Sequence, residues 1–209
     1  MSRVVILRAF RGSAPAWPDL LRIEAFLISA AVVALGEIGD KTQLLALLLA
    51  ARFKKPVAII AGILVATLVN HALAGSIGAW IASQLAPQVL RWIVGLSFIA
   101  IALWALVPDK LDEDPKPRGH AGVFLVTVTT FFLAEMGDKT QLATVALAAR
   151  YPDLVAVVAG TTLGMLIADV PAVFVADRFA ERMPLRWVRI AAAAVFAALG
   201  VATLIGLTI

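Results

Sequence analysis

The sequence predicts an all-α membrane protein whose six transmembrane helices form two inverted three-helix repeats. One reason is composition: 62% of the residues are hydrophobic, the mean hydropathy is +0.96, and only 15% of the residues are charged. Soluble domains carry roughly 25% charged residues, so this chain has too little polar material to cover a soluble surface. The other reason is a seven-residue motif that occurs twice, each time within a long apolar run. The net charge of +4 does not indicate nucleic acid, because the basic residues cluster between apolar runs, where membrane proteins place their anchors.

Six apolar runs are long enough to be transmembrane helices, which need about 20 mainly apolar residues. Polar or proline-containing breaks separate them. The runs lie at approximately 25–50, 57–83, 89–107, 122–149, 154–176 and 186–208. Four tryptophans fall near predicted helix ends, as interfacial aromatic residues do. They are Trp80, Trp92, Trp104 and Trp187.

The internal repeat predicts the domain organisation. A shift of 98 residues, without a gap, aligns residues 35–52 with residues 133–150, and 12 of the 18 pairs are identical. Each half holds three spans, and an odd number makes the second half enter the membrane from the opposite side. We therefore expect an N-terminal extension at 1–23, repeat 1 at 24–107, a polar linker at 108–121 and repeat 2 at 122–209.

The repeated motif carries the charges that lie within the apolar runs. Its two copies are Glu37-Ile38-Gly39-Asp40-Lys41-Thr42-Gln43 and Glu135-Met136-Gly137-Asp138-Lys139-Thr140-Gln141. On a continuous helix, Glu37, Asp40 and Lys41 would share one face, and so would their counterparts. Six charges facing lipid would cost on the order of 15–20 kcal/mol, more than the stability of a typical domain. The two faces must therefore meet inside the bundle.

The charges predict a binding site for a divalent cation. Four carboxylates face two ammonium groups, which leaves a net charge of minus two that a divalent ion would neutralise. Carboxylate and amide oxygens suit Ca²⁺, Mg²⁺ and Mn²⁺, and protons can occupy the same oxygens when the metal leaves. The predicted metal ligands are Glu37, Asp40, Glu135 and Asp138, with Thr42, Gln43, Thr140 and Gln141 as additional candidates and Lys41 and Lys139 tuning the charge.

A structural alternative is that Glu37–Lys41 and Glu135–Lys139 form intrahelical ion pairs at i,i+4 that only fix helix packing. Two copies at equal depth, each with two acids for one lysine, favour the functional interpretation.

The two E-Φ-G-D-K-T motifs, on the first spans of two three-helix halves joined by a charged linker, resemble the Golgi-type calcium/manganese–proton exchangers, whose bacterial relatives include manganese exporters. The resemblance covers nearly the whole chain after residue 24. It implies a transporter and not an enzyme, with the four motif acids as metal ligands. It also implies that the transported Mn²⁺ or Ca²⁺ is the bound ion, without a separate cofactor. The expected location is the inner (plasma) membrane of a bacterium.

A second polar feature lies in the middle of another span. Asp169 precedes Pro171, and a proline there should kink the helix and free a carbonyl. The residue 98 positions earlier is His71, next to Asn70. These three residues are candidates for a proton relay or for extra ligands, and the alternative is a buried polar group that bonds to a neighbouring helix.

The sequence therefore predicts a six-span secondary transporter that exchanges a divalent cation, Mn²⁺ and/or Ca²⁺, for protons. Its expected partners are cations, protons and the lipid bilayer. An exporter of a cationic solute such as lysine and a non-transporting membrane assembly subunit remain as alternatives. A membrane hydrolase is disfavoured because the chain has no cysteine and no H-E-x-x-H motif.

Overall fold

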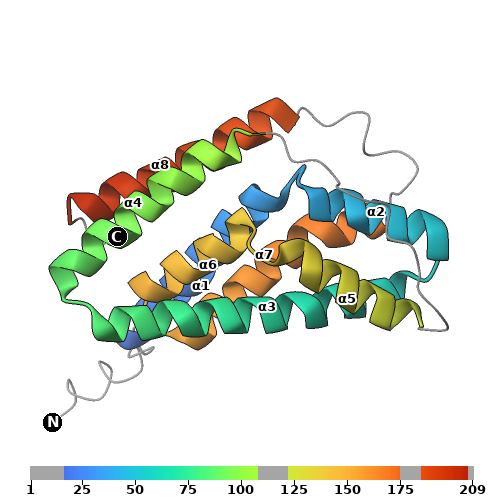
Figure 1. The fold of residues 1–209 in the computed structure, drawn as a ribbon, viewed down its shortest axis with the longest axis horizontal. Coiled ribbons are helices and arrows are strands. Elements are labelled where there is room, and N and C mark those ends of the chain that lie inside the picture. The colour runs from blue at the N-terminus through green and yellow to red at the C-terminus, as the bar shows by residue number, and fades with distance from the viewer. Residues whose placement is uncertain (1–16, 108–121, 175–184, 207–209) are drawn as a thin grey trace, which may run out of the picture.

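The computed structural model describes residues 17–107, 122–174 and 185–206 (Figure 1). These residues form eight α-helices and no strand. The helices are α1 (Trp17–Glu37), α2 (Lys41–Phe53), α3 (Pro56–Gln84), α4 (Pro87–Ala105), α5 (Val123–Glu135), α6 (Lys139–Arg150), α7 (Leu154–Phe174) and α8 (Leu185–Leu204). The predicted linker at 108–121 lies outside the described residues, as does most of the predicted extension, although α1 already begins at Trp17.

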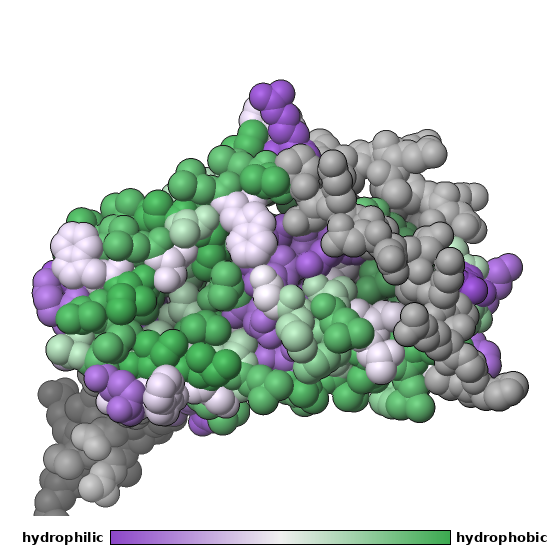
Figure 2. Space-filling model, in the orientation of Figure 1, coloured by the Kyte–Doolittle hydropathy of each residue, from purple (hydrophilic) through white to green (hydrophobic). Residues whose placement is uncertain are grey.

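Among the described residues, four helices are long and apolar enough to cross a membrane: α3, α4, α7 and residues Arg186–Leu204 of α8. They correspond to four of the six predicted spans. Large hydrophobic side chains cover much of the outer surface, and Figure 2 shows one such face with a hydrophilic area near its middle. An apolar exterior around a bundle of apolar helices is the reverse of a soluble fold and agrees with the predicted membrane class.

The other two predicted spans, 25–50 and 122–149, are not continuous helices. Each breaks in the middle of the repeated motif, after Glu37 and after Glu135. Gly39 and Gly137 adopt φ values of 81° and 78° at these breaks, a left-handed conformation that glycine adopts without a Cβ penalty. The prediction of one helical face for Glu37, Asp40 and Lys41 was wrong. Hydrophobicity alone shows where an apolar run lies, but not whether its backbone stays helical.

The two halves of the chain interlock. The first helix of each half packs along the third helix of the other half. Thus α1 lies against α7, and α5 lies against α3. Glycines permit the close approach: Gly160 of α7 lies against the backbone of Phe26 in α1, and Gly62 of α3 lies against Thr127 in α5. This packing between the two halves brings the two motif breaks together at the centre of the bundle (Figure 1).

The last helices of the two halves, α4 and α8, pack against each other as a separate pair. This pair lies on one side of the bundle, because α4 packs against α6 and α8 packs against α1. Within the described residues, neither helix of the pair packs comparably against α2 or α5. The inner helices are therefore arranged nearly symmetrically, and the outer pair is not.

Candidate cation-binding site

The breaks place all four motif acids at helix ends in the protein interior. Glu37 and Glu135 end α1 and α5, while Asp40 and Asp138 directly precede α2 and α6. Their relative exposures are 0%, 0%, 1% and 2%. Carboxylates are rarely this buried unless they are paired or bind an ion.

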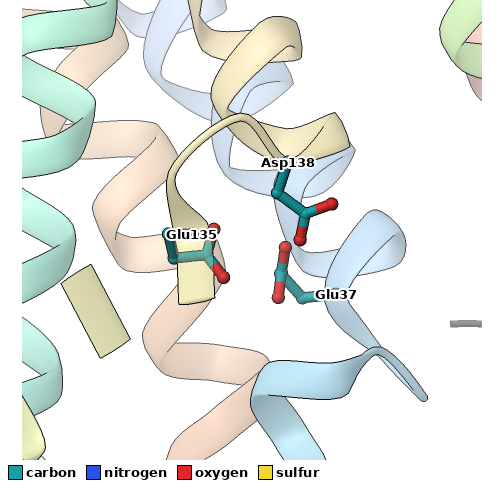
Figure 3. A group of neighbouring side chains, drawn as sticks. All are labelled: Glu37, Glu135 and Asp138. Carbon is teal, nitrogen blue, oxygen red and sulfur yellow. The ribbon is translucent and has the colours of Figure 1, made fainter. Parts of the chain in front are cut away.

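Three of these acids form a compact group. One carboxylate oxygen each from Glu37, Glu135 and Asp138 lies within 4.8 Å of the other two (Figure 3). Figure 3 shows the three side chains converging from the ends of α1 and α5 and from the start of α6. Both halves of the chain thus contribute oxygens to one small volume, which is the arrangement that binds a hard cation.

The fourth acid, Asp40, is held by a lysine from the other half. Lys139 Nζ lies 2.7 Å from Asp40 Oδ1, and Lys41 Nζ lies 3.3 Å from Asp138 Oδ2. The two ion pairs cross between the repeats. The alternative of intrahelical pairs within each motif was therefore wrong, because the helix ends between each glutamate and its nearest lysine.

The motif threonines hold the glutamates. Thr42 Oγ1 donates a hydrogen bond to Glu37 Oε2 at 2.5 Å, and Thr140 Oγ1 donates to Glu135 Oε2 at 3.0 Å. In the described part of the chain, the second oxygen, Oε1, of each glutamate is buried without a hydrogen-bond partner. Each threonine thus orients a carboxylate and leaves one of its oxygens for another ligand.

The motif glutamines brace the breaks. Gln43 Oε1 accepts the N–H of Gly39 at 2.9 Å, and Gln141 Oε1 accepts the N–H of Gly137 at 2.6 Å. Their amide groups reach other helices, since Gln43 donates to the carbonyl of Ala168 at 2.9 Å and Gln141 to Asn70 Oδ1 at 3.4 Å. The side-chain oxygens of these two glutamines, which were predicted as additional ligands, thus accept hydrogen bonds from the backbone.

The second polar feature lies beside this centre. Asp169 is fully buried on α7, and neither of its oxygens has a hydrogen-bond partner among the described residues. It lies near enough to Glu37 and Glu135 to interact with them electrostatically. Both ring nitrogens of the buried His71 likewise have no hydrogen-bond partner in the described part of the chain, whereas Asn70 donates to the carbonyl of Phe132 at 3.0 Å. Within the described residues, the side chain of Asn70 therefore has a hydrogen-bond partner, and those of Asp169 and His71 have none.

Two buried hydroxyl groups were not singled out in the sequence. Ser29 on α1 and Thr67 on α3 are fully buried, and their hydroxyl oxygens lack a hydrogen-bond partner within the described residues. A single serine or threonine in an apolar run is common in membrane helices, so the sequence holds no signal that separates these two from packing residues.

An apolar helical bundle that buries a cluster of acids and crossed lysine–aspartate pairs is typical of membrane proteins that transport cations. The model of the family described as "Divalent cation/proton antiporter GDT1" matches residues 25–113 and 123–208, and the chain belongs to this family. It is therefore an antiporter and not an enzyme.

Individual relatives agree. A Vibrio cholerae protein named "Putative manganese exporter" is 49% identical over 177 residues, which cover 84% of this chain and 88% of the relative. A GDT1-like protein of Synechocystis is 30% identical over 77% of this chain and 88% of its own length. GDT1-like protein 4 of rice is 29% identical over 77% of this chain and 66% of its own length. No solved structure matches the chain.

Proposed function

We propose that this antiporter exchanges Mn²⁺, with Ca²⁺ as a second substrate, for protons, and that Glu37, Glu135 and Asp138 bind the cation in the conformation described here. The main support is the group of three buried carboxylate oxygens, drawn from both repeats, within 4.8 Å of one another. Oxygen ligands suit both ions and do not separate them. The similarity to the Vibrio cholerae protein favours Mn²⁺.

In the proposed topology, the polypeptide chain crosses the membrane six times. In this arrangement α1 with α2 forms one crossing and α5 with α6 another, and the four long helices supply the rest. The opposite directions of α1–α2 and α5–α6 along the molecule in Figure 1 support inverted repeats, and the helix breaks then lie near mid-membrane. Broken helices that line an internal site are a recurring plan in secondary transporters. The proposed location is the inner membrane of a bacterium.

The crossed lysines suggest how the site changes during transport. In the described conformation the side chain of Lys139 is 3% exposed on Asp40, while that of Lys41 is 24% exposed beside Asp138. If the two repeats swap conformations, each of these residues takes the position that its counterpart in the other repeat occupies now. In the opposite-facing conformation, Asp40 would therefore join Glu37 and Glu135, and Lys41 would be buried on Asp138. Both aspartates thus act as ligands, but in different conformations.

Protons complete the exchange by charge balance. With Asp169 included, the centre has five carboxylates and two lysines, so cation release leaves negative charge in the membrane interior. Protons that replace the cation remove this charge. Asp169, together with His71, is proposed to pass protons to this centre, because both are buried without hydrogen-bond partners among the described residues. Asn70 then orients the neighbouring helices.

The test is flux in proteoliposomes that contain the purified full chain. An imposed pH gradient should drive Mn²⁺ uptake, Glu37→Gln and Asp138→Asn should abolish it, and Asp19→Asn, the same chemical change at an exposed residue, should not. Normal flux in both site variants would refute the ligand assignment. Lysine flux without Mn²⁺ flux would favour the exporter of a cationic solute, and a folded protein that transports neither would favour the assembly subunit.

A further inference from the structure

A cavity lies at the end of the bundle where α1 begins and α8 ends. Its volume is about 380 Å³. Its lining residues come from the first turns of α1 and α4, from the end of α6 and the α6–α7 connection, and from the end of α8. In Figure 1 this end of the bundle lies at the left, and the motif breaks lie nearer the centre. The lining residues are mostly apolar, with two arginines, a tyrosine and a threonine.

The charge of this cavity is positive. Arg91 lies in the first helical turns of α4, Arg150 ends α6, and no carboxylate of the described residues lines the cavity. Two carboxylates beside the lining residues already have partners. Glu24 accepts a hydrogen bond from Tyr151 at 3.3 Å, and Asp153 pairs with Arg22 at 3.0 Å.

The two guanidinium groups retain hydrogen-bonding capacity. Arg150 donates to Thr203 Oγ1 at 2.8 Å and stacks over the ring of Tyr151 at 5.3 Å. The Nε atoms of both Arg91 and Arg150 are nevertheless buried without an acceptor among the described residues. A buried donor without an acceptor costs stability, and a guanidinium fork matches the oxygens of a phosphate group.

The position of the cavity along the helices and its apolar lining indicate which kind of phosphate compound it binds. The arginines lie at the ends of apolar helices, the level at which lipid headgroups meet a membrane protein, and basic pockets between helices at this level bind anionic headgroups. Leu21, Leu90 and Val94 form an apolar wall beside them. Trp92, next to Arg91, is 49% exposed, as an interfacial anchor is.

We propose that Arg91 and Arg150 bind the phosphate group of an anionic membrane phospholipid. The lipid joins α4 to α6 and supports the packing of the α4–α8 pair against this side of the bundle. This site is independent of the cation site and of the identity of the transported ion.

The experiment measures lipid binding to the purified full chain in detergent, by native mass spectrometry and by thermal unfolding. The probes are phosphatidylglycerol, phosphatidylcholine and inorganic phosphate. The chain should bind phosphatidylglycerol in preference to phosphatidylcholine, and its unfolding temperature should rise only with the former. Arg91→Gln should weaken binding of phosphatidylglycerol about 10-fold, the effect of losing a charge-assisted hydrogen bond. Adding Arg150→Gln to this variant should weaken binding about 10-fold more.

Lys55→Gln is the matched control, because Lys55 is exposed at the other end of α3 and lies outside the cavity. Equal binding of the two lipids, or full binding by the double variant, would overturn the proposal. An equal loss in Lys55→Gln would assign the effect to general surface charge and also overturn it. Competition by inorganic phosphate at similar concentration would keep the phosphate site but reject a lipid as its source. Arg91→Gln alone leaves the contacts of Arg150 with Thr203 and Tyr151 intact, so it tests the site even if the double variant folds poorly.

Discussion

Lys139 of the second repeat lies 2.7 Å from the carboxylate of Asp40 in the first repeat. The pair is almost completely buried, whereas the equivalent pair of Lys41 and Asp138 is longer, at 3.3 Å, and its lysine is 24% exposed. Two identical stretches of sequence thus lie in different environments, and the following predictions use this difference.

We expect Lys139→Met to destabilise the protein more than Lys41→Met. Removal of one partner from a buried ion pair costs about 3–5 kcal/mol. The loss of Lys41 should cost less, because its side chain is 24% exposed and an ion pair with a partly exposed member contributes less to stability. Thermal unfolding in detergent measures both. Asp40→Asn added to Lys139→Met should restore part of the loss, and equal effects of the two single variants would contradict the observed asymmetry.

Thr42→Val should reduce the apparent affinity for Mn²⁺ by roughly 10-fold, because it removes a hydrogen bond to a charged group that is worth about 1.5 kcal/mol or more. Thr42→Ser keeps the hydroxyl donor and should bind almost as the wild type does. Calorimetric titration with Mn²⁺ compares the three proteins. Equal affinity in Thr42→Val would show that the hydroxyl does not orient Glu37 for binding.

Gly137→Ala should destabilise the second break by about 1–2 kcal/mol, the cost of a left-handed conformation for a residue with a Cβ. The added Cβ would meet nothing within 4 Å, so the effect is purely conformational. Gly122→Ala also has open space but a φ of −61°, and it should cost less. The difference in unfolding free energy between the two variants is the measured quantity.

Binding of Mn²⁺ should release protons, and its apparent affinity should fall as the pH decreases. The sign follows from competition: cation and protons neutralise the same oxygens, so protons added at low pH must leave before the cation binds. Calorimetry in two buffers of different ionisation enthalpy counts the protons released. Asp169→Asn should release fewer protons while it keeps the three-carboxylate group. An unchanged proton count in this variant would remove Asp169 from the proposed relay.

Much of the functional chemistry could be predicted from the sequence because it is carried by residue type and repetition. Glu37 and Glu135 stand out as acids in apolar runs at a 98-residue spacing, and the energetic cost of such charges in lipid requires that they meet. The family model matches both halves of the chain, which confirms the predicted class of divalent cation/proton antiporters. The breaks at Gly39 and Gly137 could not be placed, because a glycine in an apolar run is compatible with either a continuous or a broken helix.

The sequence alone determined the membrane class, the two halves and the acids that must be buried, since these follow from hydrophobicity and charge counted along the chain. Only the tertiary structure decided which lysine neutralises which aspartate, and that Asp138 but not Asp40 joins the two glutamates. Two copies of one motif have the same local chemistry. The helices packed around them differ, since α8 contacts α1 and α4 contacts α6, without comparable contacts to α2 and α5 among the described residues.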